Sequence, residues 1–426
     1  MTSASTRSTG ISKLRPKMSY QCLSCSCTME REVLSLGAQP VSNALVRPET
    51  VGSGERFFPL NVMICDACHL AQLVDCPPAD VHFHADYVYF SSFSDSWLEH
   101  CQRYAEQMIS RFSPRPGALM LEVASNDGYL LKIYRRLGYP VLGIEPSASV
   151  ANAAIGAGVP TEVRFFGKSL GQELAGRGIA PEFIVANNVL AHVPDLNDFA
   201  AGFPPLMSDR TVLTCEIHYF RDLIEKNQFD SFYHEHYSYF TVAAARDLFQ
   251  RHEMRLFDVE RLPTHGGSLR LYMCRAQSHH TNTDRLRDTL ADEQTFFDAL
   301  PIVLDDFQKR VFDVCTSLRQ FLVDMRREGR SVAGFGAPAK ASTLLNMAGI
   351  RRQLLPYTVD NNPTKQGKML PGVHIPILSP DAITIDKPDF LVILPWNLRA
   401  EIAANYDVIR QWGGRFVVPI PKLEIF

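Results

Sequence analysis

Short apolar runs alternate with amphipathic segments through the middle of the chain. Each run ends at polar or acidic residues, and the segment that begins at Tyr129, after the first run, has helical periodicity. Such runs are typical of buried strands in a parallel sheet, with helices between them. The pattern predicts a doubly wound α/β domain over residues 81–275. Its expected strands are residues 118–124, 141–145, 183–186 and 211–216.

A second pattern of strand, turn and helix occupies residues 330–426. An apolar run from Ser331 leads into a Gly-x-Gly turn and then into a helical stretch that begins at Lys340. Two more strand-like runs, residues 355–360 and 389–394, predict a second Rossmann-like α/β domain. Between the two domains, residues 276–329 carry Leu and Phe at helical spacing and predict a helical connector.

Composition and charge narrow the class of protein. A chain of 426 residues with 46% hydrophobic and 21% charged residues is expected to be a soluble globular protein of several domains. A net charge of −3 gives no electrostatic reason to expect a nucleic-acid or membrane partner. Residues 1–18 are basic and rich in Ser and Thr without an apolar stretch, so we expect a disordered leader in a cytoplasmic protein rather than a secretory signal.

Four of the ten cysteines form two Cys-x-x-Cys pairs, Cys22 with Cys25 and Cys65 with Cys68. Four thiolates in two such pairs can surround zinc tetrahedrally, so residues 19–80 are predicted to form a structural zinc module, in preference to free thiols or disulfides. The 39 residues between the pairs are expected to form a loop or short strands. A closed set of four cysteine ligands leaves no position for catalysis.

The turn after the first predicted strand is acidic and lacks the Gly-x-Gly-x-x-Gly spacing that lets a pyrophosphate approach the backbone. It suits a cationic ligand without phosphate, such as S-adenosylmethionine, although taken alone it could be an ordinary turn. Glu145 ends the next strand and would accept hydrogen bonds from ribose hydroxyls. The candidate cofactor-binding residues are Glu122, Ala124, Ser125, Asn126, Asp127, Gly128, Tyr129, Glu145, Pro146, Asn187, Asn188 and His192.

Residues 229–240 hold two histidines, one glutamate and three tyrosines. Such a density of titratable groups is costly to bury and indicates acid/base chemistry, with Tyr233, Glu235 and His236 as the first candidates. His234 is expected to contact substrate or framework. A zinc site at His234-x-His236 would need both side chains on one face of a strand and a third ligand, which the sequence does not offer. His218, at a strand end, is expected to be a framework residue.

A series of motifs follows along the chain: the two cysteine pairs, Glu122–Gly128, Tyr233-His-Glu-His236, His265-Gly-Gly-Ser268, Gly334–Lys340 and Leu394-Pro-Trp-Asn397. In this order the motifs resemble those of the three-domain sugar C-methyltransferases that build branched deoxysugars in antibiotic pathways. The resemblance covers residues 20 to 420. It implies a zinc module, a central S-adenosylmethionine domain and a C-terminal Rossmann-like domain, with a nucleotide sugar between the last two. The chain departs from the family pattern after Lys340, where glycine is common, and in its longer leader.

The resemblance also implies roles for single residues. His236 would be the base, with Glu235 and Tyr233 beside it and a further tyrosine, Tyr87 or Tyr89, in the same site. The implied reaction is methylation at carbon 3 of a nucleotide-linked 4-keto-deoxysugar, with dTDP as the expected nucleotide, by a monomer or weak homo-oligomer. The alternatives are methylation of a non-sugar carbon acid and a non-catalytic nucleotide-sugar-binding protein. The candidate substrate-binding residues are Tyr89, His234, His265, Gly266, Ser268, Gly336, Lys340, Asp360, Lys365, Trp396 and Asn397.

Overall fold

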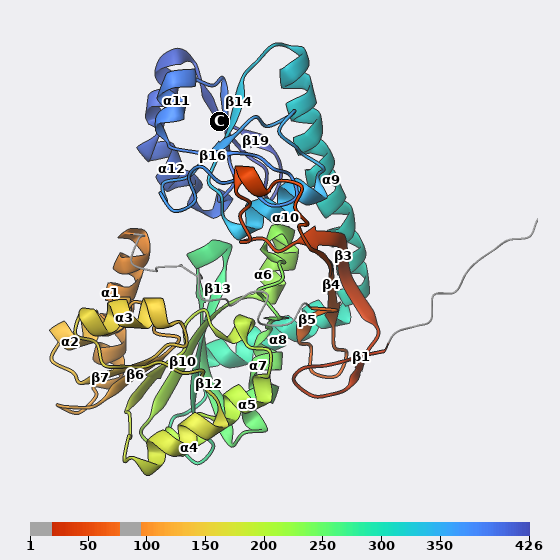
Figure 1. Ribbon diagram of the computed structural model, residues 1–426. Coiled ribbons are helices and arrows are strands. Elements are labelled where there is room, and N and C mark those ends of the chain that lie inside the picture. Colours follow the sequence, from red (N-terminus) through yellow and green to blue (C-terminus); the bar gives the residue numbers. More distant parts are fainter. Residues whose placement is uncertain (1–18, 77–94) are drawn as a thin grey trace, which may run out of the picture.

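Three larger β-sheets organise the computed structural model, which describes residues 19–76 and 95–426. In Figure 1 a seven-stranded sheet lies at the bottom, a six-stranded sheet lies at the top, and the four-stranded sheet of the N-terminal module lies between them. The α/β class and the three-part layout predicted from the sequence are confirmed. The leader, Tyr87 and Tyr89 lie outside the described residues.

The central sheet has the order β12-β13-β10-β9-β6-β7-β8, and β13 runs antiparallel to both of its neighbours. Ile184 packs into the core on one face of the sheet, and Phe183 and Val185 pack into the core on the other face. Burial on both faces explains why the strands are continuous apolar runs. The strands are β6 (Met120–Val123), β7 (Val141–Ile144), β8 (Thr161–Glu162), β9 (Phe183–Val185), β10 (Val212–His218), β12 (Met254–Leu262) and β13 (Ser268–Arg275).

Helices cover both faces of this sheet (Figure 1). One core takes side chains from α1 (Asp95–Phe112), α2 (Tyr129–Arg136) and α3 (Ala148–Gly156). The other core takes side chains from the helices α4 (Lys168–Gly176), α5 (Leu196–Ala201), α7 (Val242–Gln250) and α8 (Asp284–Asp298). Loops at the carboxyl ends of the parallel strands stay available for a ligand.

The N-terminal module contains longer strands than the sequence indicated. The segment between the cysteine pairs forms β3 (Arg31–Pro40) and β4 (Phe57–Ile64). The prediction that this segment is a loop or short strands was therefore wrong. In β4, every second side chain, of Leu60, Val62 and Ile64, points into a hydrophobic core that the module shares with the C-terminal domain. The sheet order is β11-β5-β4-β3, which adds β11 (Ser238–Tyr239), from the titratable segment 229–240, to β5 (Ala71–Val74). A small hairpin, β1 (Tyr20–Gln21) with β2 (Thr28–Met29), precedes them.

The C-terminal sheet has the order β16-β15-β14-β17-β18-β19, in which β18 and β19 pair antiparallel and the other pairs are parallel. Its strands are β14 (Val332–Phe335), β15 (Thr358–Val359), β16 (Ile377–Leu378), β17 (Phe390–Ile393), β18 (Arg415–Val418) and β19 (Glu424–Ile425). Its helices are α10 (Ala339–Met347), α11 (Asp381–Asp386) and α12 (Arg399–Asn405).

The long helix α9 (Leu300–Arg327) runs beside the N-terminal module and the C-terminal domain (Figure 1). Its residues Phe307, Val311 and Leu318 share one core with strands of both. The short helix α6 (Phe220–Glu225) packs against α9, so the central domain joins the same core. None of the helices in the described residues is long and apolar enough to cross a lipid bilayer.

Candidate active site

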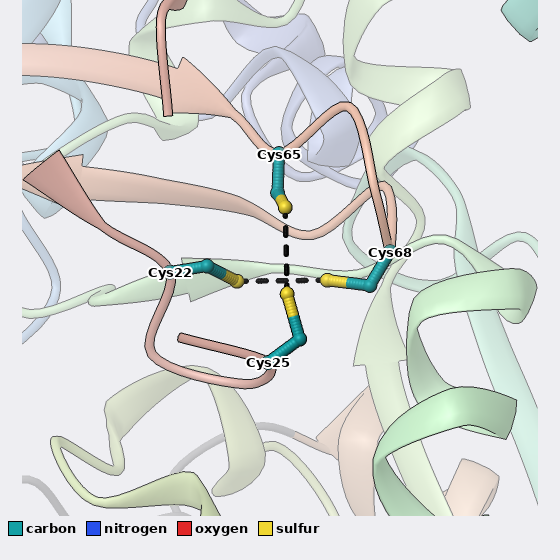
Figure 2. Close-up of side chains that lie close together, drawn as sticks. All are labelled: Cys22, Cys25, Cys65 and Cys68. Atoms are coloured by element: carbon teal, nitrogen blue, oxygen red, sulfur yellow. Dashed lines mark hydrogen bonds between the residues drawn. The ribbon is translucent and has the colours of Figure 1, made fainter. Parts of the chain in front are cut away.

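Two cysteine pairs converge on one point in the N-terminal module (Figure 2). All four Sγ atoms lie within 4.8 Å of one another, with Cys22 and Cys68 at 3.5 Å and Cys25 and Cys65 at 3.6 Å. Zinc–sulfur bonds of about 2.3 Å in a tetrahedron separate the sulfurs by roughly 3.8 Å. The four thiols therefore fit structural zinc. The neighbouring residues point elsewhere, since Cys27 is exposed and His69 stacks on Phe297 at 3.7 Å.

The zinc-binding turns are joined to the catalytic segment, residues 229–240. Gln72 of β5 pairs with Ser238 of β11. The Gln72 side chain also accepts a hydrogen bond from the Leu23 amide at 2.8 Å and donates to the Gln21 carbonyl at 3.0 Å. These two bonds hold the first cysteine turn against β5. The zinc centre thereby braces the strand that directly follows the catalytic candidates.

The turn after β6 adopts strained backbone conformations. Ala124, Asn126 and Gly128 have φ angles of 57°, 51° and 74°. A left-handed conformation costs a residue such as alanine roughly 1–2 kcal/mol, and strain of this kind clusters at ligand sites. The amide of Ser125 donates to the Ile144 carbonyl at 3.1 Å, which holds the turn against the end of β7.

Glu145 lies at the end of β7, beside this turn. Its carboxylate accepts hydrogen bonds from the amides of Asn126 at 3.0 Å and Ser147 at 2.8 Å. Burial raises the pKa of Glu145, and these two bonds oppose the rise. Each carboxylate oxygen has a second lone pair, so Glu145 can still accept from ribose hydroxyls. Pro146, which follows it, is half-buried.

Two buried acceptors mark the same edge of the sheet as a ligand site. Asp127 Oδ1 and Asn188 Oδ1 have no hydrogen-bond partner within the described residues. Because buried polar atoms are nearly always bonded, this edge suits a ligand that donates, as the ammonium of S-adenosylmethionine does. Asn187 has a different task, since its Oδ1 accepts from the Glu216 amide at 3.1 Å and ties β9 to β10. Glu122 faces Tyr129, and burial raises the pKa of this carboxyl well above its usual range.

Residues 233–236 form a turn rather than a strand, so alternate side chains do not share a face. His234 is buried, and its Nε2 lies 3.2 Å from the Pro59 carbonyl of the N-terminal module. His236 faces Tyr233 instead. Within the described part of the chain, only the four cysteines form a group of three or more metal-ligating residues. The geometry does not favour metal binding by the two histidines.

The hydrogen bonds of His236 select one tautomer. Nδ1 lies 3.3 Å from the Ser231 carbonyl, which can only accept, so Nδ1 carries the proton. In the neutral ring Nε2 is therefore unprotonated, and it accepts from the Tyr233 hydroxyl at 2.8 Å. The basic nitrogen of His236 thus lies beside a phenol.

Two more imidazoles lie beside His236, and a third lies beyond His218. Its ring centroid lies 4.7 Å from that of His192 and 5.2 Å from that of His218, and His218 lies 5.4 Å from His265. Burial, and then the neighbouring His192 and His218, lower the pKa of His236 well below its usual range. Burial also lowers the pKa of His192 to about 4 and that of His265 to about 4. The histidine cluster, His192, His218, His236 and His265, is therefore neutral at pH 7 and can accept protons.

Glu235 points away from the histidine cluster. Its two oxygens accept from Asn43 Nδ2 of the N-terminal module at 2.7 and 2.9 Å. Burial raises the pKa of Glu235 to about 7, and the bond from Asn43 lowers it. In this arrangement the Ser231 carbonyl, rather than Glu235, holds the imidazole of His236 in one tautomer.

The loop between β12 and β13 brings His265 to the histidine cluster. Thr264 donates to Glu216, at the carboxyl end of β10, at 2.8 Å. Ser268 is buried and its hydroxyl donates to the Thr264 carbonyl at 3.0 Å, so Ser268 braces the loop. Gly266 has a φ of 95°, and a β-carbon there would lie 2.4 Å from the Trp396 ring. Glycine is required because the two domains meet at this point.

The candidate substrate-binding residues of the C-terminal domain separate into two groups. In the first group, Asp360 accepts from the Ala337 amide at 2.8 Å, and Lys365 donates to the Ala337 carbonyl at 3.0 Å. Gly336 has a φ of 89°, and a β-carbon there would lie 2.5 Å from Pro395. These contacts brace the turn after β14.

The second group lies toward the histidine cluster. Lys340 donates to Asn397 at 3.2 Å, and its ammonium lies 4.6 Å from the centre of the Trp396 ring. The Trp396 indole donates to Asp230 of the catalytic segment at 2.8 Å. Loops from both α/β domains and the catalytic segment therefore meet at one place.

Several of these residues were not singled out from the sequence. Asn43 and Asp230 carried no motif, since their partners lie 192 and 166 residues away. His218 was expected to be a framework residue, but it stands in the histidine cluster between His236 and His265. Its position at the carboxyl end of β10 was the available signal.

Comparisons with known proteins agree with this layout. Family models match in sequence order: a zinc binding domain at residues 22–83, a methyltransferase domain at 97–257 and a C-methyltransferase C-terminal domain at 263–421. The chain is 32% identical over 405 residues to the C-methyltransferase NovU of Streptomyces niveus, covering 95% of this chain and 96% of that protein. The cofactors predicted from the sequence, S-adenosylmethionine and structural zinc, are confirmed by these matches and the cysteine cluster.

Solved structures that match part of the chain include two methyltransferases with bound SAH. One is the magnesium protoporphyrin IX methyltransferase ChlM of Synechocystis PCC 6803, at 14% identity, 42% of this chain, 83% of that one and a TM-score of 0.33. The other is the plantazolicin methyltransferase BpumL, at 12% identity, 42% of this chain, 82% of that one and a TM-score of 0.33. Scores this low add nothing to the sequence matches.

Proposed function

Because the chain belongs to the C-methyltransferase family, and is an S-adenosylmethionine-dependent enzyme, we propose that it methylates carbon 3 of a nucleotide-linked 4-keto-deoxysugar. The observation that carries the proposal is the orientation of His236. Its unprotonated Nε2 lies beside Tyr233 at the place where loops of both α/β domains meet. A carbon nucleophile beside a ketone is made by removing a proton, and the unprotonated Nε2 has a lone pair that can accept it.

His236 is the proposed general base. The hydrogen on carbon 3 is acidified by the neighbouring carbonyl. The proton passes to Nε2, its bonding pair enters the bond between carbon 3 and carbon 4, and the π pair of the carbonyl moves onto oxygen. The resulting enolate would attack the donor's methyl group through carbon 3, as the carbonyl re-forms. The Ser231 carbonyl stabilises the imidazolium that results, because it keeps its bond to Nδ1–H. Tyr233 contacts the same nitrogen at 2.8 Å and is proposed to orient the sugar. Tyr87 or Tyr89, outside the described residues, is the proposed further tyrosine.

S-adenosylmethionine, when bound, supplies an electrophilic methyl group. The proposed residues that hold it are Glu145 for the ribose and Asp127 and Asn188 for donors of the amino acid part. The remaining residues of the turn after β6 are proposed to hold these side chains in position, because the left-handed backbone of the turn sets their directions. His192, whose ring lies beside that of His236, is proposed to contact the cofactor.

The nucleotide part of the substrate is proposed to lie on the C-terminal domain, along the turns after β14 and β17. Gly336, Asp360 and Lys365 build the first of these turns, and Trp396 and Asn397 build the second. His265 and Gly266 face the second turn from the central domain. The sugar ring would then reach the histidine cluster.

The proposal is tested by incubating the purified protein with S-adenosylmethionine and dTDP-4-keto-6-deoxyglucose. The expected product is a sugar nucleotide heavier by one methyl group, with the new carbon attached to carbon 3 in its NMR spectrum. Methylation of oxygen, or no reaction with this or a 2-deoxy 4-keto-sugar nucleotide, would contradict the proposal. Turnover of a non-sugar ketone instead would support the alternative carbon acid.

A further inference from the structure

Lys340, near the start of α10, brings a positive charge to the histidine cluster. The ammonium acts on three imidazoles, since its charge is among the causes that lower the pKa values of His218, His236 and His265. The lysine side chain is half-buried and lies deep enough for burial to lower the pKa of its own ammonium. The Trp396 ring next to its ammonium also packs against Gly266, the neighbour of His265, so the charge lies at the reacting end of the proposed substrate site.

The position of this ammonium is set from two sides. Asn397 accepts one of its hydrogen bonds at 3.2 Å, and the Trp396 ring lies below it at 4.6 Å. The Trp396 indole is held in turn by Asp230 at 2.8 Å. Trp396 and Asn397 follow β17, whereas Asp230 comes from the catalytic segment, so both elements orient the lysine.

Helix α10 is also attached directly to the catalytic segment. Thr343, one turn after Lys340, donates to the Phe232 carbonyl at 3.0 Å. Phe232 precedes Tyr233, which contacts His236 at 2.8 Å. The lysine and the proposed base therefore belong to one connected unit, and their separation does not depend on a flexible linker.

The ammonium keeps donors for a ligand. It has three N–H groups, and Asn397 accepts one of them. In the described part of the chain no carboxylate oxygen lies within 4.0 Å of it, in contrast to Lys365, which lies 3.5 Å from Asp360. The charge of Asp230 raises the pKa of this ammonium without direct contact, so the free N–H groups can still bind a ligand atom that becomes negative during a reaction.

We propose that Lys340 binds the ketone oxygen of the substrate and stabilises the oxyanion that forms when His236 removes the neighbouring proton. This inference rests on the proposed function. As the proton moves from carbon 3 to His236 Nε2, its pair forms the second bond between carbon 3 and carbon 4. The π pair of the carbonyl moves onto oxygen at the same time, and Lys340 donates a hydrogen bond to that oxygen. Asn397 is a positioning residue for the ammonium.

The proton-removal step can be measured without methyl transfer. In D₂O with SAH and dTDP-4-keto-6-deoxyglucose, the wild-type protein is expected to exchange the carbon-3 hydrogen for deuterium. The exchange is measured as the loss of the carbon-3 proton signal in the NMR spectrum. Lys340→Met keeps the length of the side chain and removes the charge. Loss of one oxyanion donor typically costs about 10²–10³ in rate, so exchange at saturating substrate should fall by about that factor.

Controls separate this role from a structural or phosphate-binding role. Lys340→Met should keep its affinities for SAH and for dTDP, measured by calorimetry, within about threefold, because neither ligand carries the ketone. Asn397→Ala leaves the charge in place and should slow exchange by about tenfold, the equivalent of one hydrogen bond of roughly 1.4 kcal/mol. Lys309→Met, a charge removal on the exposed surface of α9, should behave as wild type.

The outcomes are distinct. Exchange by Lys340→Met at the wild-type rate overturns the role of Lys340 and leaves the proposed function intact. Unchanged exchange at saturating substrate with dTDP affinity at least tenfold weaker also overturns it, and assigns Lys340 to the diphosphate. If wild-type protein exchanges no hydrogen at carbon 3, the proposed function fails, and the role of Lys340 fails with it.

Discussion

Replacing Glu235 by glutamine tests whether the carboxyl beside the proposed base serves the fold or the reaction. The Glu235 side chain is buried and bonded to Asn43 through both oxygens, at 2.7 and 2.9 Å. Glutamine has the same shape, and its oxygen can accept from Asn43 in the same place. The substitution removes the one titratable carboxyl group at this position and leaves the contact with the N-terminal module largely intact.

The magnitude follows from the pKa of Glu235, which burial raises from 4.5 to about 7. Between these pH values the folded protein binds more protons at this site than the unfolded chain, so stability falls as pH rises through the window. A difference of about 2.5 pKa units is worth about 3 kcal/mol. Below pH 4.5 the wild-type protein carries none of this cost, and above pH 7 it carries all of it. Glu235→Gln carries none of it at any pH.

The assay is guanidinium unfolding of both proteins between pH 4.5 and 8.5, with zinc present. The free energy of unfolding of Glu235→Gln minus that of wild type should increase by about 3 kcal/mol between pH 4.5 and 8. Glu328→Gln, at an exposed site after α9, is the matched control and should show no such increase. A difference that stays constant with pH would refute a buried carboxyl with a raised pKa. Methyl transfer should fall less in Glu235→Gln than in a variant of His236.

Three further predictions concern the base and the zinc centre. His236→Gln should reduce methyl transfer by at least about 10²-fold and leave SAH affinity unchanged in calorimetry; turnover close to wild type would assign the base elsewhere. Because burial and the neighbouring imidazoles lower the pKa of His236, the acid limb of kcat/KM should lie below pH 6.5, and a limb at or above 7 would contradict a neutral base. Cys65→Ser should lower both zinc content, measured by atomic emission, and the melting temperature, since Cys65 is one of four converging thiols; full zinc content would disprove the ligand set.

Much of the α/β fold was predictable because its signals are local. The run at 118–124 contains β6 (Met120–Val123), and the run at 389–394 contains β17 (Phe390–Ile393). Where a predicted strand is longer than the observed one, a residue within the run explains the difference. Only Thr358 and Val359 of the run at 355–360 pair as β15, and Pro356 has no amide to donate to a ladder.

The zinc module shows the limit of that approach. Spacing identified its cysteines, but the long strands β3 and β4 were missed because the segment between the pairs also contains Gly, Pro and Ser. These strands are stabilised by the core shared with α9 and the C-terminal domain. The strands can be this long because they pack against α9 and the C-terminal domain, which lie more than 200 residues away in the chain.

The candidate site divides in the same way. The composition of residues 229–240 indicated acid/base chemistry, but the direction of each side chain depended on a backbone that the structure shows to be a turn. That turn is held by Asn43 on one side and by Thr343, through Phe232, on the other. Neither contact has a signature in the sequence, because each joins elements that meet only after the domains have packed.

The sequence by itself determined which chemical groups the protein carries: four thiols for zinc, an acidic turn for a cationic cofactor, and a segment rich in titratable side chains. Only the tertiary structure decided how they are used. It turned Glu235 toward Asn43, placed His218 beside His236, and brought Lys340 to the histidine cluster. The physical reason is range, since strand pattern and ligand spacing depend on neighbours in the chain. Tautomer, pKa and charge placement instead depend on whatever the packed domains bring within a few ångströms.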